Sequence, residues 1–208
     1  MQITTKDRIL IEAEKMFIDQ GIANTQMKDI ALALNINRRT LYRYFPTKDE
    51  LAFEVELIVM RQIQEYLSLE VDTMMDMNGF QKVEAYFDHV NFEAIKEQMK
   101  FTAEFDRYFQ GDYPSTQLTD AFIVSLDPRK EQLYQFISQG VKDGSIRSDL
   151  SPSDLFHFIS QDFFALFQRL ILREKHLKHE YCDQVDFQKL FKDILLRGIR
   201  SMSDSNTI

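Results

Sequence analysis

Residues 38–44 of this chain contain three arginines and two tyrosines. A guanidinium group can donate two parallel hydrogen bonds to a guanine edge or to a phosphate, and a tyrosine hydroxyl can bind phosphate. No acidic residue interrupts the longer segment 32–48. Arg38, Arg39 and Arg43 therefore form a basic strip of the kind that binds a nucleic acid.

This strip contrasts with the charge of the whole protein. The chain has 208 residues and a formal net charge of −8, yet residues 1–52 carry eight Lys and Arg against seven Asp and Glu, a net of +1. The rest of the chain therefore carries −9. Because salt screens each charge beyond about 8–10 Å in the cell, a local basic patch can bind phosphate although the protein is acidic.

Two short helices joined by a tight turn are predicted to position the strip. In the first helix, Met27, Ile30, Ala31 and Leu34 recur at the spacing of one buried helical face. Thr25 precedes that helix and is predicted to be its N-cap, because a threonine oxygen can accept a hydrogen bond from the first turn.

The turn itself is predicted from its two asparagines. Asn35 stands where the backbone needs a positive φ, which asparagine tolerates better than most residues. Asn37 can cap the second helix, which runs to about Tyr44. Leu41 and Phe45 lie four residues apart and should face the core, so the arginines are left on the outer face.

Helices are also predicted on both sides of this pair. One covers about Thr5–Asp19 and ends at Gly21, since glycine suits a left-handed helix end. Pro46 stops the arginine-bearing helix. Thr47 and Glu50 then have the spacing of a capping box at the start of the next helix.

The rest of the chain also has helical periodicity. Patterns are visible over about 80–109, from 127–128 to 140–144, from 151 onward and over about 183–202. Only 6 Gly and 4 Pro interrupt the chain, and 18 Phe can supply a core. We therefore predict an all-α fold.

The sequence also bounds the cellular setting. A single cysteine, Cys182, allows no disulfide within the chain. The N-terminus lacks the pattern of a signal peptide, and no apolar run reaches the roughly 18–20 residues of a membrane span. We expect a cytoplasmic protein that does not enter a membrane.

The first 60 or so residues resemble the TetR family of bacterial transcriptional regulators. The match includes Ile30-Ala31, the asparagine turn and the run TLYRYFPTKDEL over residues 40–51, which has every fixed position of the family's usual TLYxxFxxKxxL. Asn35, Asn37 and Arg39 depart from the common Gly, Ser and small residue of the family. These departures leave the DNA-binding logic intact, although the Arg38–Arg39 pair should change which operator is read.

The resemblance implies a two-domain organisation. Residues 1–52 would form a three-helix DNA-binding domain with its helix-turn-helix at 26–45. Residues 53–208 would form a helical effector-binding and dimerisation domain, and about nine helices are expected in all. The segment 140–152 also looks like the one that precedes helix 8 in this family.

In a helix-turn-helix the second helix enters the major groove of DNA. The residues expected to contact DNA lie on that helix or at the helix ends beside it. They are Thr25, Gln26, Asn37, Arg38, Arg39, Thr40, Tyr42, Arg43, Tyr44 and Lys48. Arg38 and Arg39 are the better candidates for reading bases because they lie early in the helix, whereas Thr25, Gln26, Tyr42, Tyr44 and Lys48 are better placed for phosphate.

Sixteen of the 18 Phe lie beyond residue 52. Aromatic stripes at helical spacing are usually core, but the family places an effector pocket among its middle helices, and a pocket lined this way suits an apolar or aromatic compound. The candidate lining residues are Phe101, Glu104, Phe105, Tyr108, Phe122, Tyr134, Phe163 and Phe167, with Phe109 and Phe164 nearby. Arg107, His157 and Asp162 are further polar candidates for orienting a ligand.

The last helix carries one apolar face. We expect this face to join the preceding helix in a four-helix bundle with a second subunit; packing within one chain is the alternative. The face consists of Phe187, Leu190, Phe191, Ile194, Leu195 and Ile199.

The sequence also bears on a metal site and on an enzyme active site. His176, His179 and Cys182 have residue types that bind zinc, but they lie in a Lys-rich link where solvated side chains are the usual case, so no metal is expected. No phosphate-binding loop, nucleophile elbow or metalloprotease helix is present, and neither an enzymatic activity nor a cofactor is predicted.

The expected protein is a homodimeric, DNA-binding repressor released from its operator by a small hydrophobic or aromatic effector. Two alternatives stay open. The same DNA-binding head could serve an activator or a regulator controlled by a protein partner. The chain could also be a small-molecule-binding protein without DNA function, against which Arg38 and Arg39 argue.

Overall fold

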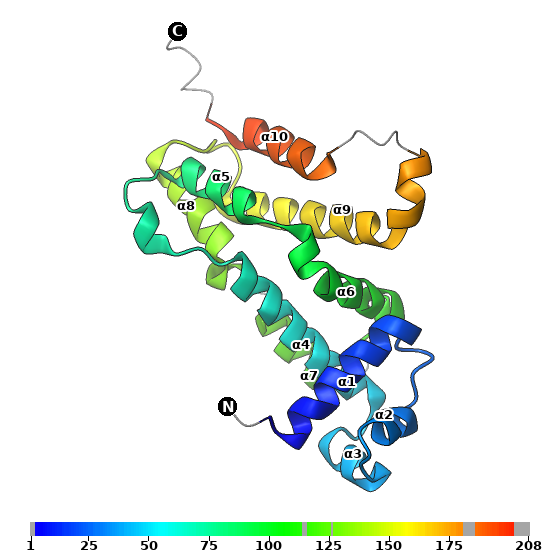
Figure 1. Cartoon of the computed structure of the whole chain (residues 1–208). Helices are drawn as coiled ribbons and strands as arrows, with labels where there is room; N and C mark the ends of the chain where they lie inside the picture. The colour runs from blue at the N-terminus through cyan, green and yellow to red at the C-terminus, as the bar shows by residue number, and fades with distance from the viewer. Residues whose placement is uncertain (1–2, 114–115, 126, 181–185, 202–208) are drawn as a thin grey trace. The chain divides into compact units, whose positions relative to one another are not determined.

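The computed structural model describes residues 3–113, 116–125, 127–180 and 186–201 (Figure 1). Within these residues the fold is helical apart from one isolated β-bridge, so the all-α prediction is confirmed. The α-helices are α1 (Thr5–Gln20), α2 (Met27–Ala33), α3 (Arg38–Tyr44), α4 (Lys48–Leu67), α5 (Gly79–His89), α6 (Lys96–Phe109), α7 (Thr116–Ser125), α8 (Gln132–Asp143), α9 (Pro152–Glu180) and α10 (Phe187–Ile199). Short 3₁₀ turns are η1 (Val71–Met74), η2 (Phe92–Ile95) and η3 (Pro128–Lys130).

The helices form two compact units. Unit 1 comprises residues 1–63 and 95–126, and it holds α1 to α3, most of α4, α6 and α7. Unit 2 comprises residues 64–94 and 127–208, and it holds α5, α8, α9 and α10. None of the described helices has a stretch long and apolar enough to cross a lipid bilayer.

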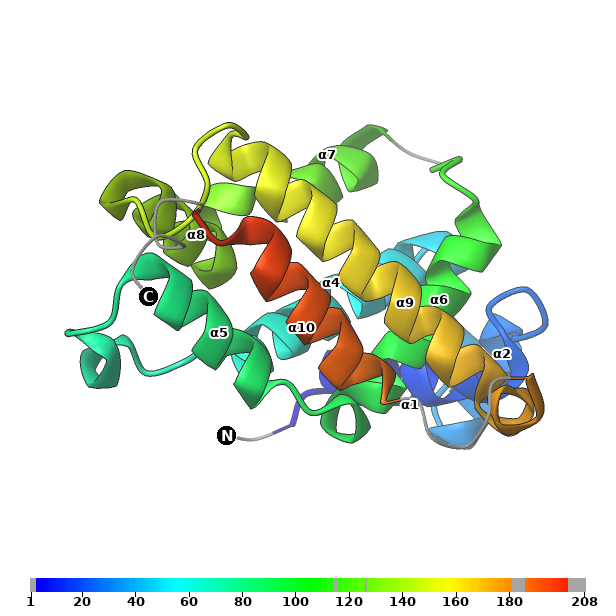
Figure 2. The same cartoon turned by 90° about the horizontal axis from the view of Figure 1, so that it is seen from above.

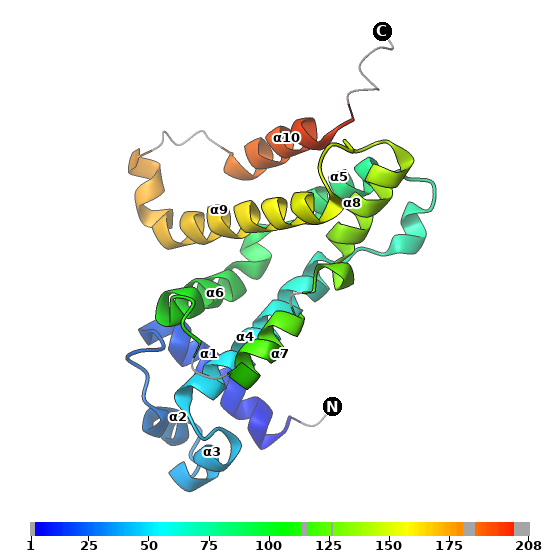
Figure 3. The same ribbon diagram turned by 180° about the vertical axis from the view of Figure 1, so that it is seen from behind.

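Unit 1 is built around the buried face of α1. The helix starts with a capping box, in which the Thr4 hydroxyl accepts from the Asp7 N–H at 3.2 Å and the Asp7 carboxylate accepts from the Thr4 N–H at 2.9 Å. It ends at Gly21, whose φ of +83° favours glycine. Phe17 is fully buried and stacks on Phe101 of α6, and Figure 3 shows α6 beside α1.

Helices α4 and α7 lie side by side in the same unit (Figure 3). Their contact includes Phe53 and Phe122, whose ring centroids are 6.0 Å apart. Helix α7 is not among the helices predicted from the sequence. Its apolar residues are only partly covered, since Ile123 and Val124 are 59% and 62% exposed.

Unit 2 has a close crossing of α5 and α8. A Cβ added at Gly79 would lie 2.0 Å from the Gly140 nitrogen, so only glycine permits this approach. The Gly79 N–H also donates to the Asp143 carboxylate at 2.8 Å. In the same unit α10 lies along α9 in the opposite direction (Figure 2), and its end is tied back by a bond of 2.9 Å from the Arg147 N–H to the Ile199 carbonyl.

The prediction of one helix over residues 80–109 is wrong. Helix α5 ends at His89, a 3₁₀ turn follows, and α6 starts at Lys96. Asn91 causes the break, because its side chain accepts from the Glu93 N–H at 3.1 Å and its own N–H donates to the Tyr66 hydroxyl at 3.1 Å. Apolar residues continue at helical spacing through this turn, so the pattern alone does not reveal it.

Two other helix boundaries also differ from the prediction. Asp127 starts a 3₁₀ turn, its carboxylate accepting from the Arg129 N–H at 3.1 Å, and α8 begins only at Gln132. The last helix is described over Phe187–Ile199 with Asp186 as its N-cap. The predicted ends of that helix, Asp183 and Met202, lie outside the described residues.

Candidate DNA-binding surface

Asn35 terminates α2 as predicted. Its φ is +53°, and it occupies the position after the helix end that usually carries glycine. The Asn35 N–H donates to the Leu32 carbonyl at 3.0 Å, and the Ile36 N–H reaches back to the Ala31 carbonyl at 3.0 Å. This pair of bonds is the Schellman arrangement, which reverses the chain and sets the direction of α3.

Asn37 caps α3, also as predicted. Its side-chain oxygen accepts from the Arg39 N–H at 2.8 Å. Leu41 and Phe45 are 0% and 1% exposed and fasten the inner face of α3 to the core of unit 1. The opposite face is consequently fixed toward solvent over the whole of this short helix.

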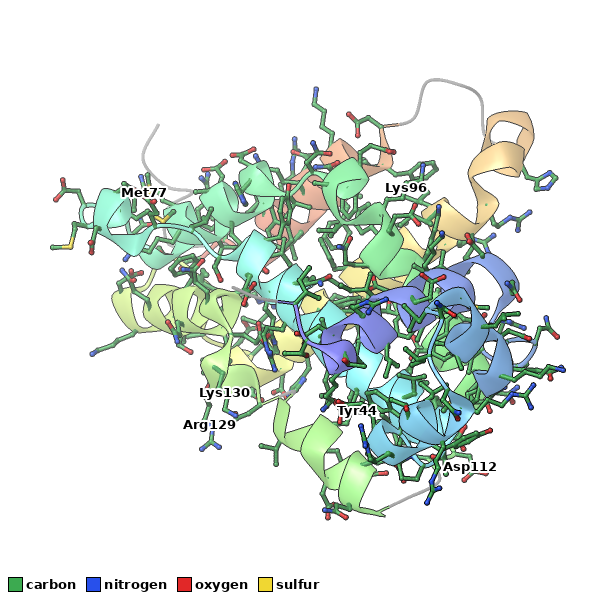
Figure 4. The ribbon with its side chains drawn as sticks, turned by 60° about the horizontal axis from the view of Figure 1, so that its bottom comes forward. Tyr44, Met77, Lys96, Asp112, Arg129 and Lys130 are labelled. Atoms are coloured by element: carbon green, nitrogen blue, oxygen red, sulfur yellow. The ribbon has the colours of Figure 1, made fainter. Side chains whose placement is uncertain are left out.

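The exposed face of α3 carries the cations. Arg38, Arg39 and Arg43 are all exposed, and no acidic side chain among the described residues forms an ion pair with any of them. Tyr42 and Tyr44 are 47% and 37% exposed on the same short helix. Figure 4 draws these side chains, with Tyr44 labelled on α3. Three uncompensated guanidinium groups give this face a positive potential suited to phosphate and guanine.

Thr25 points into the unit. It is 1% exposed, and its hydroxyl donates to the Gly21 carbonyl at 2.9 Å and lies 3.3 Å from the Met16 carbonyl. The prediction that Thr25 caps α2 is wrong, because Gln26 takes the N-cap position and its side chain makes no capping bond. The hydroxyl of Thr25 instead holds the corner between α1 and α2. Gln26 is exposed beside that corner.

Lys48 binds three backbone carbonyls of the same corner. Its ammonium group donates to Ile22 at 2.6 Å, Ala23 at 3.0 Å and Thr25 at 3.2 Å. Burial lowers the pKa of this amine. Because an ammonium group has three N–H donors, Lys48 has none left over in this arrangement for the phosphate contact that the sequence predicts.

Replacing Lys48 with methionine is expected to destabilise the protein by about 1–3 kcal/mol. The change removes three hydrogen bonds and leaves the carbonyls of the corner without their partner. Thermal unfolding measures the effect, and Lys15→Met on the exposed face of α1 is the matched control. A Lys48 variant with normal stability but weaker DNA binding would instead identify this lysine as a phosphate contact.

Three predicted pocket residues on α6 face the helices of the head. Phe101 stacks on Phe17, as described above. The Glu104 carboxylate accepts from the Ile22 N–H at 2.5 Å and is itself paired with Arg107. The Tyr108 hydroxyl donates to Asp49 at 3.0 Å, and burial together with that bond raises the pKa of Tyr108 to about 12. Helix α6 thus holds the α1–α2 corner directly.

The other pocket candidates in unit 1 belong to an aromatic cluster around Phe53, which is fully buried on α4. Ring centroids surround Phe53 at 5.0 Å for Phe105, 4.8 Å for Phe109, 5.1 Å for Tyr113 and 6.0 Å for Phe122. All four contacts to Phe53 are edge-on. We call these five rings the Phe53 cluster.

Phe53, Tyr113 and their polar neighbour Glu56 are not among the site residues predicted from the sequence. A signal for Glu56 does exist. It lies three residues after Phe53 and three before Val59, both fully buried, so the helical period places this carboxyl on the inner face of α4.

The remaining pocket candidates lie in unit 2. Phe163 and Phe167 are buried in an aromatic core with Phe87, Phe92 and Phe191. The other four are Tyr134, whose ring contacts Phe156, half-buried Phe164, and His157 and Asp162, which are exposed. A ligand-binding role for these residues stays a prediction.

The apolar face of α10 divides into buried and exposed members. Ile199 is buried, and Phe191 contacts the rings of Phe87, Phe163 and Phe167. Phe187 and Leu195 are half-buried. In contrast, Leu190 and Ile194 are 46% and 62% exposed, and Phe158 and Leu172 of α9 are 65% and 67% exposed. These four residues, which we call the α9–α10 strip, leave apolar surface uncovered in one chain.

No group of three or more metal-binding side chains occurs in the part of the chain that the structure describes. Of the zinc candidates, His176 is exposed on α9. Cys182 lies outside the described residues, and the side chain of His179 is not described either.

The capped turn and the outward cations of α3 define a helix-turn-helix DNA-binding protein. Residues 9–55 match the family model described as bacterial regulatory proteins, tetR family. The chain thus carries the N-terminal domain of the TetR family, and its fold is one that solved members share. It is a DNA-binding transcriptional regulator.

Individual relatives agree with this assignment. The transcriptional repressor KstR2 of Mycolicibacterium smegmatis is 26% identical over 161 residues, which are 74% of this chain and 73% of KstR2. A tetR family regulator from Shewanella sp. PV-4 superposes with a TM-score of 0.66 at 15% identity, covering 95% of this chain and 98% of that one. FadR of Thermus thermophilus, solved with lauroyl-CoA, gives 0.58 at 16% identity over 92% and 91%. At these identities the two solved structures bear on the fold alone.

Proposed function

We propose that this protein is a homodimeric repressor that leaves its operator when a small hydrophobic effector binds. Residues 1–52 would be its DNA-binding domain, and residues 53–208 would bind the effector and the second subunit. The observation that carries the proposal is the exposed face of α3, where three arginines have no acidic partner among the described side chains.

The proposed reading of DNA follows from the order of residues along α3. Arg38 and Arg39 lie at the start of the helix, the end that meets base edges in a helix-turn-helix, and Arg suits guanine. Thr40 can contact a thymine methyl. Gln26, Arg43 and the two tyrosines of α3 would bind phosphate. Thr25 and Lys48 would act from behind by holding the α1–α2 corner.

The proposed dimer uses the α9–α10 strip. Apolar residues left exposed on two adjacent helices can be covered by the same strip of a second copy around a two-fold axis. Two heads would then meet successive major grooves, whose centres lie about 34–36 Å apart in B-DNA. A near-palindromic operator is the expected target.

The contacts of α6 support control by an effector. This helix supplies Phe105 and Phe109 to the Phe53 cluster, and it also supplies Glu104 to the α1–α2 corner. A ligand that displaces α6 would therefore move the head that carries α3. By linkage, operator DNA must weaken effector binding by the same factor. Two of the similar proteins are in keeping with this scheme. FadR of Thermus thermophilus was solved with lauroyl-CoA, and KstR2 is a repressor.

Selecting bound sequences from a random DNA library tests the proposal, and Arg39→Ala sharpens the test. We expect the wild-type protein to select a near-palindrome. The variant should lose about 1–3 kcal/mol of binding free energy and relax the preference at one position of each half-site, because a base-reading guanidinium is gone.

Lys28→Ala is the matched comparison, since Lys28 is an exposed cation on the neighbouring helix α2. It should weaken binding about equally for all sequences if it contacts phosphate. An unchanged preference in the Arg39 variant would remove the base-reading assignment. Failure to select any DNA would remove the regulator proposal itself.

A further inference from the structure

Glu56 is a buried residue with one unsatisfied carboxyl oxygen. It is 3% exposed, and its Oε2 atom has no hydrogen-bond partner among the described residues. Among the described residues no Lys, Arg or His forms an ion pair with it. Burying a polar group without a hydrogen bond destabilises the fold, so a carboxyl in this position calls for a reason other than stability.

The groups facing Glu56 make its burial less favourable still. Asp106 of α6 is close enough for its charge to act on Glu56 and on the Tyr113 hydroxyl. Burial first and Asp106 second raise the pKa of Glu56 to about 8. The pKa of Tyr113 is raised by burial, by Asp106 and by Glu56. The site thus gathers two carboxyls and a phenol, a set of oxygens suited to a cation.

Apolar rings lie next to these oxygens. Glu56 is one helical turn from Phe53, and Asp106 lies between Phe105 and Phe109 of the Phe53 cluster in the sequence. The face of an aromatic ring attracts a cation, most strongly where water is excluded. Tyr113 and Phe122 are only half-buried and Asp106 is exposed, so this group of side chains extends from the interior of unit 1 to its surface.

We infer that Glu56, Asp106, Tyr113 and the Phe53 cluster form the effector site, and that its ligand is a hydrophobic cation such as a protonated arylalkyl amine. The inference rests on the proposed function and adds the chemistry of the effector. The Glu56 carboxylate would hold the cationic group while the rings contact the apolar body. An acyl carboxylate or a phosphate ester would find no cation in this site and would be repelled by the charge of Asp106. A neutral compound would leave Glu56 protonated and would gain no attraction between opposite charges.

Binding of the cation is coupled to a proton. Near pH 7 Glu56 retains its proton in the free protein, and the arriving ammonium group favours the carboxylate, so the proton is released to solvent. The affinity for a cation should therefore rise with pH until about pH 8 to 9 and then level off. A neutral ligand should show no such dependence.

The test uses three probes with one phenylalkyl body: phenylbutylammonium, phenylbutanol and phenylpentanoate. Isothermal titration calorimetry on the full chain at about pH 9 should give at least a tenfold preference for the ammonium compound over the other two. Glu56→Gln should weaken ammonium binding by tenfold or more and abolish its pH dependence. Glu65→Gln, the same change at an exposed site of α4, should alter neither.

Thermal unfolding shows that the Glu56 variant is folded before it is titrated. Equal affinity for the three probes, or normal ammonium binding by Glu56→Gln, would overturn the inference. A protein that selects operator DNA but shows no preference for the ammonium probe leaves the regulator proposal standing and removes this one. A protein that prefers the ammonium probe but selects no DNA keeps the cation site and removes the regulator proposal.

Discussion

Glu56→Gln is expected to make the protein more stable, and more so as the pH rises. The carboxyl of Glu56 has a normal pKa near 4.5 in the unfolded chain and about 8 in the folded one, chiefly because burial disfavours its charge. Below pH 4.5 both states carry the proton, and the ionisation of Glu56 adds no penalty to folding. Between these values only the unfolded chain ionises, so the free energy of unfolding falls steadily.

The penalty is complete above about pH 8, where the folded protein ionises as well. A pKa difference of this size corresponds to on the order of 4–5 kcal/mol, a large part of the stability of an ordinary domain. Glutamine has nearly the same shape and no charge to desolvate. The variant should therefore equal the wild-type protein near pH 4 and exceed it by a few kcal/mol at pH 8.

Urea unfolding followed by circular dichroism across pH 4 to about pH 9 gives the two stability curves. Glu65→Gln on the exposed face of α4 should follow the wild-type curve. Curves for wild type and Glu56→Gln that run parallel over the whole range would mean that Glu56 is solvated or paired in solution. A buried group that destabilises the free protein is a usual cost of a binding site. A ligand that neutralises the group binds only the folded state and therefore stabilises it.

The DNA-binding head could be predicted because local rules decide it. The positive φ of Asn35, the cap at Asn37 and the inner positions of Leu41 and Phe45 depend on neighbours within one or two helical turns. Each rule points to the same capped pair of helices. Once these positions are assigned, the outer face of α3 is known as the candidate DNA-binding face, and no long-range contact is needed to find it.

Side chains that reach across the fold could not be predicted in this way. Thr25 and Lys48 have residue types that suit phosphate, yet both bind the carbonyls of the α1–α2 corner. Lys48 does so over more than twenty positions of sequence, a distance that no periodic pattern contains. The same reason hides the break at Asn91, whose N–H is held by Tyr66 on another helix.

The high phenylalanine content is correct evidence for aromatic clusters, but it does not show what these clusters do. It indicates large aromatic clusters, and the structure places one in each unit, around Phe53 and around Phe163. Composition alone does not distinguish rings that pack in a core from rings that line a ligand-binding site. In unit 1 one polar atom separates these two cases, because Oε2 of Glu56 is buried and has no hydrogen-bond partner among the described residues.

Placing glutamate at both Leu190 and Ile194 is expected to yield monomers that bind the operator roughly 100-fold more weakly. These two residues are exposed on α10, so their replacement removes apolar surface from the proposed interface and adds four charges to each dimer. Binding through one head forfeits the advantage of two linked heads, which commonly amounts to two or more orders of magnitude. Phe191 is unsuitable for this test, because it contacts Phe87, Phe163 and Phe167 within the chain.

Sedimentation velocity measures the oligomeric state, and titration of a labelled operator measures the affinity. Met75→Glu is the matched control, since Met75 is 79% exposed in the same unit but outside α9 and α10. It should remain dimeric and bind DNA normally. A double variant that stays dimeric would exclude the α9–α10 strip as the interface, and the exposed Ile123 and Val124 of α7 would then be the next apolar surface to test.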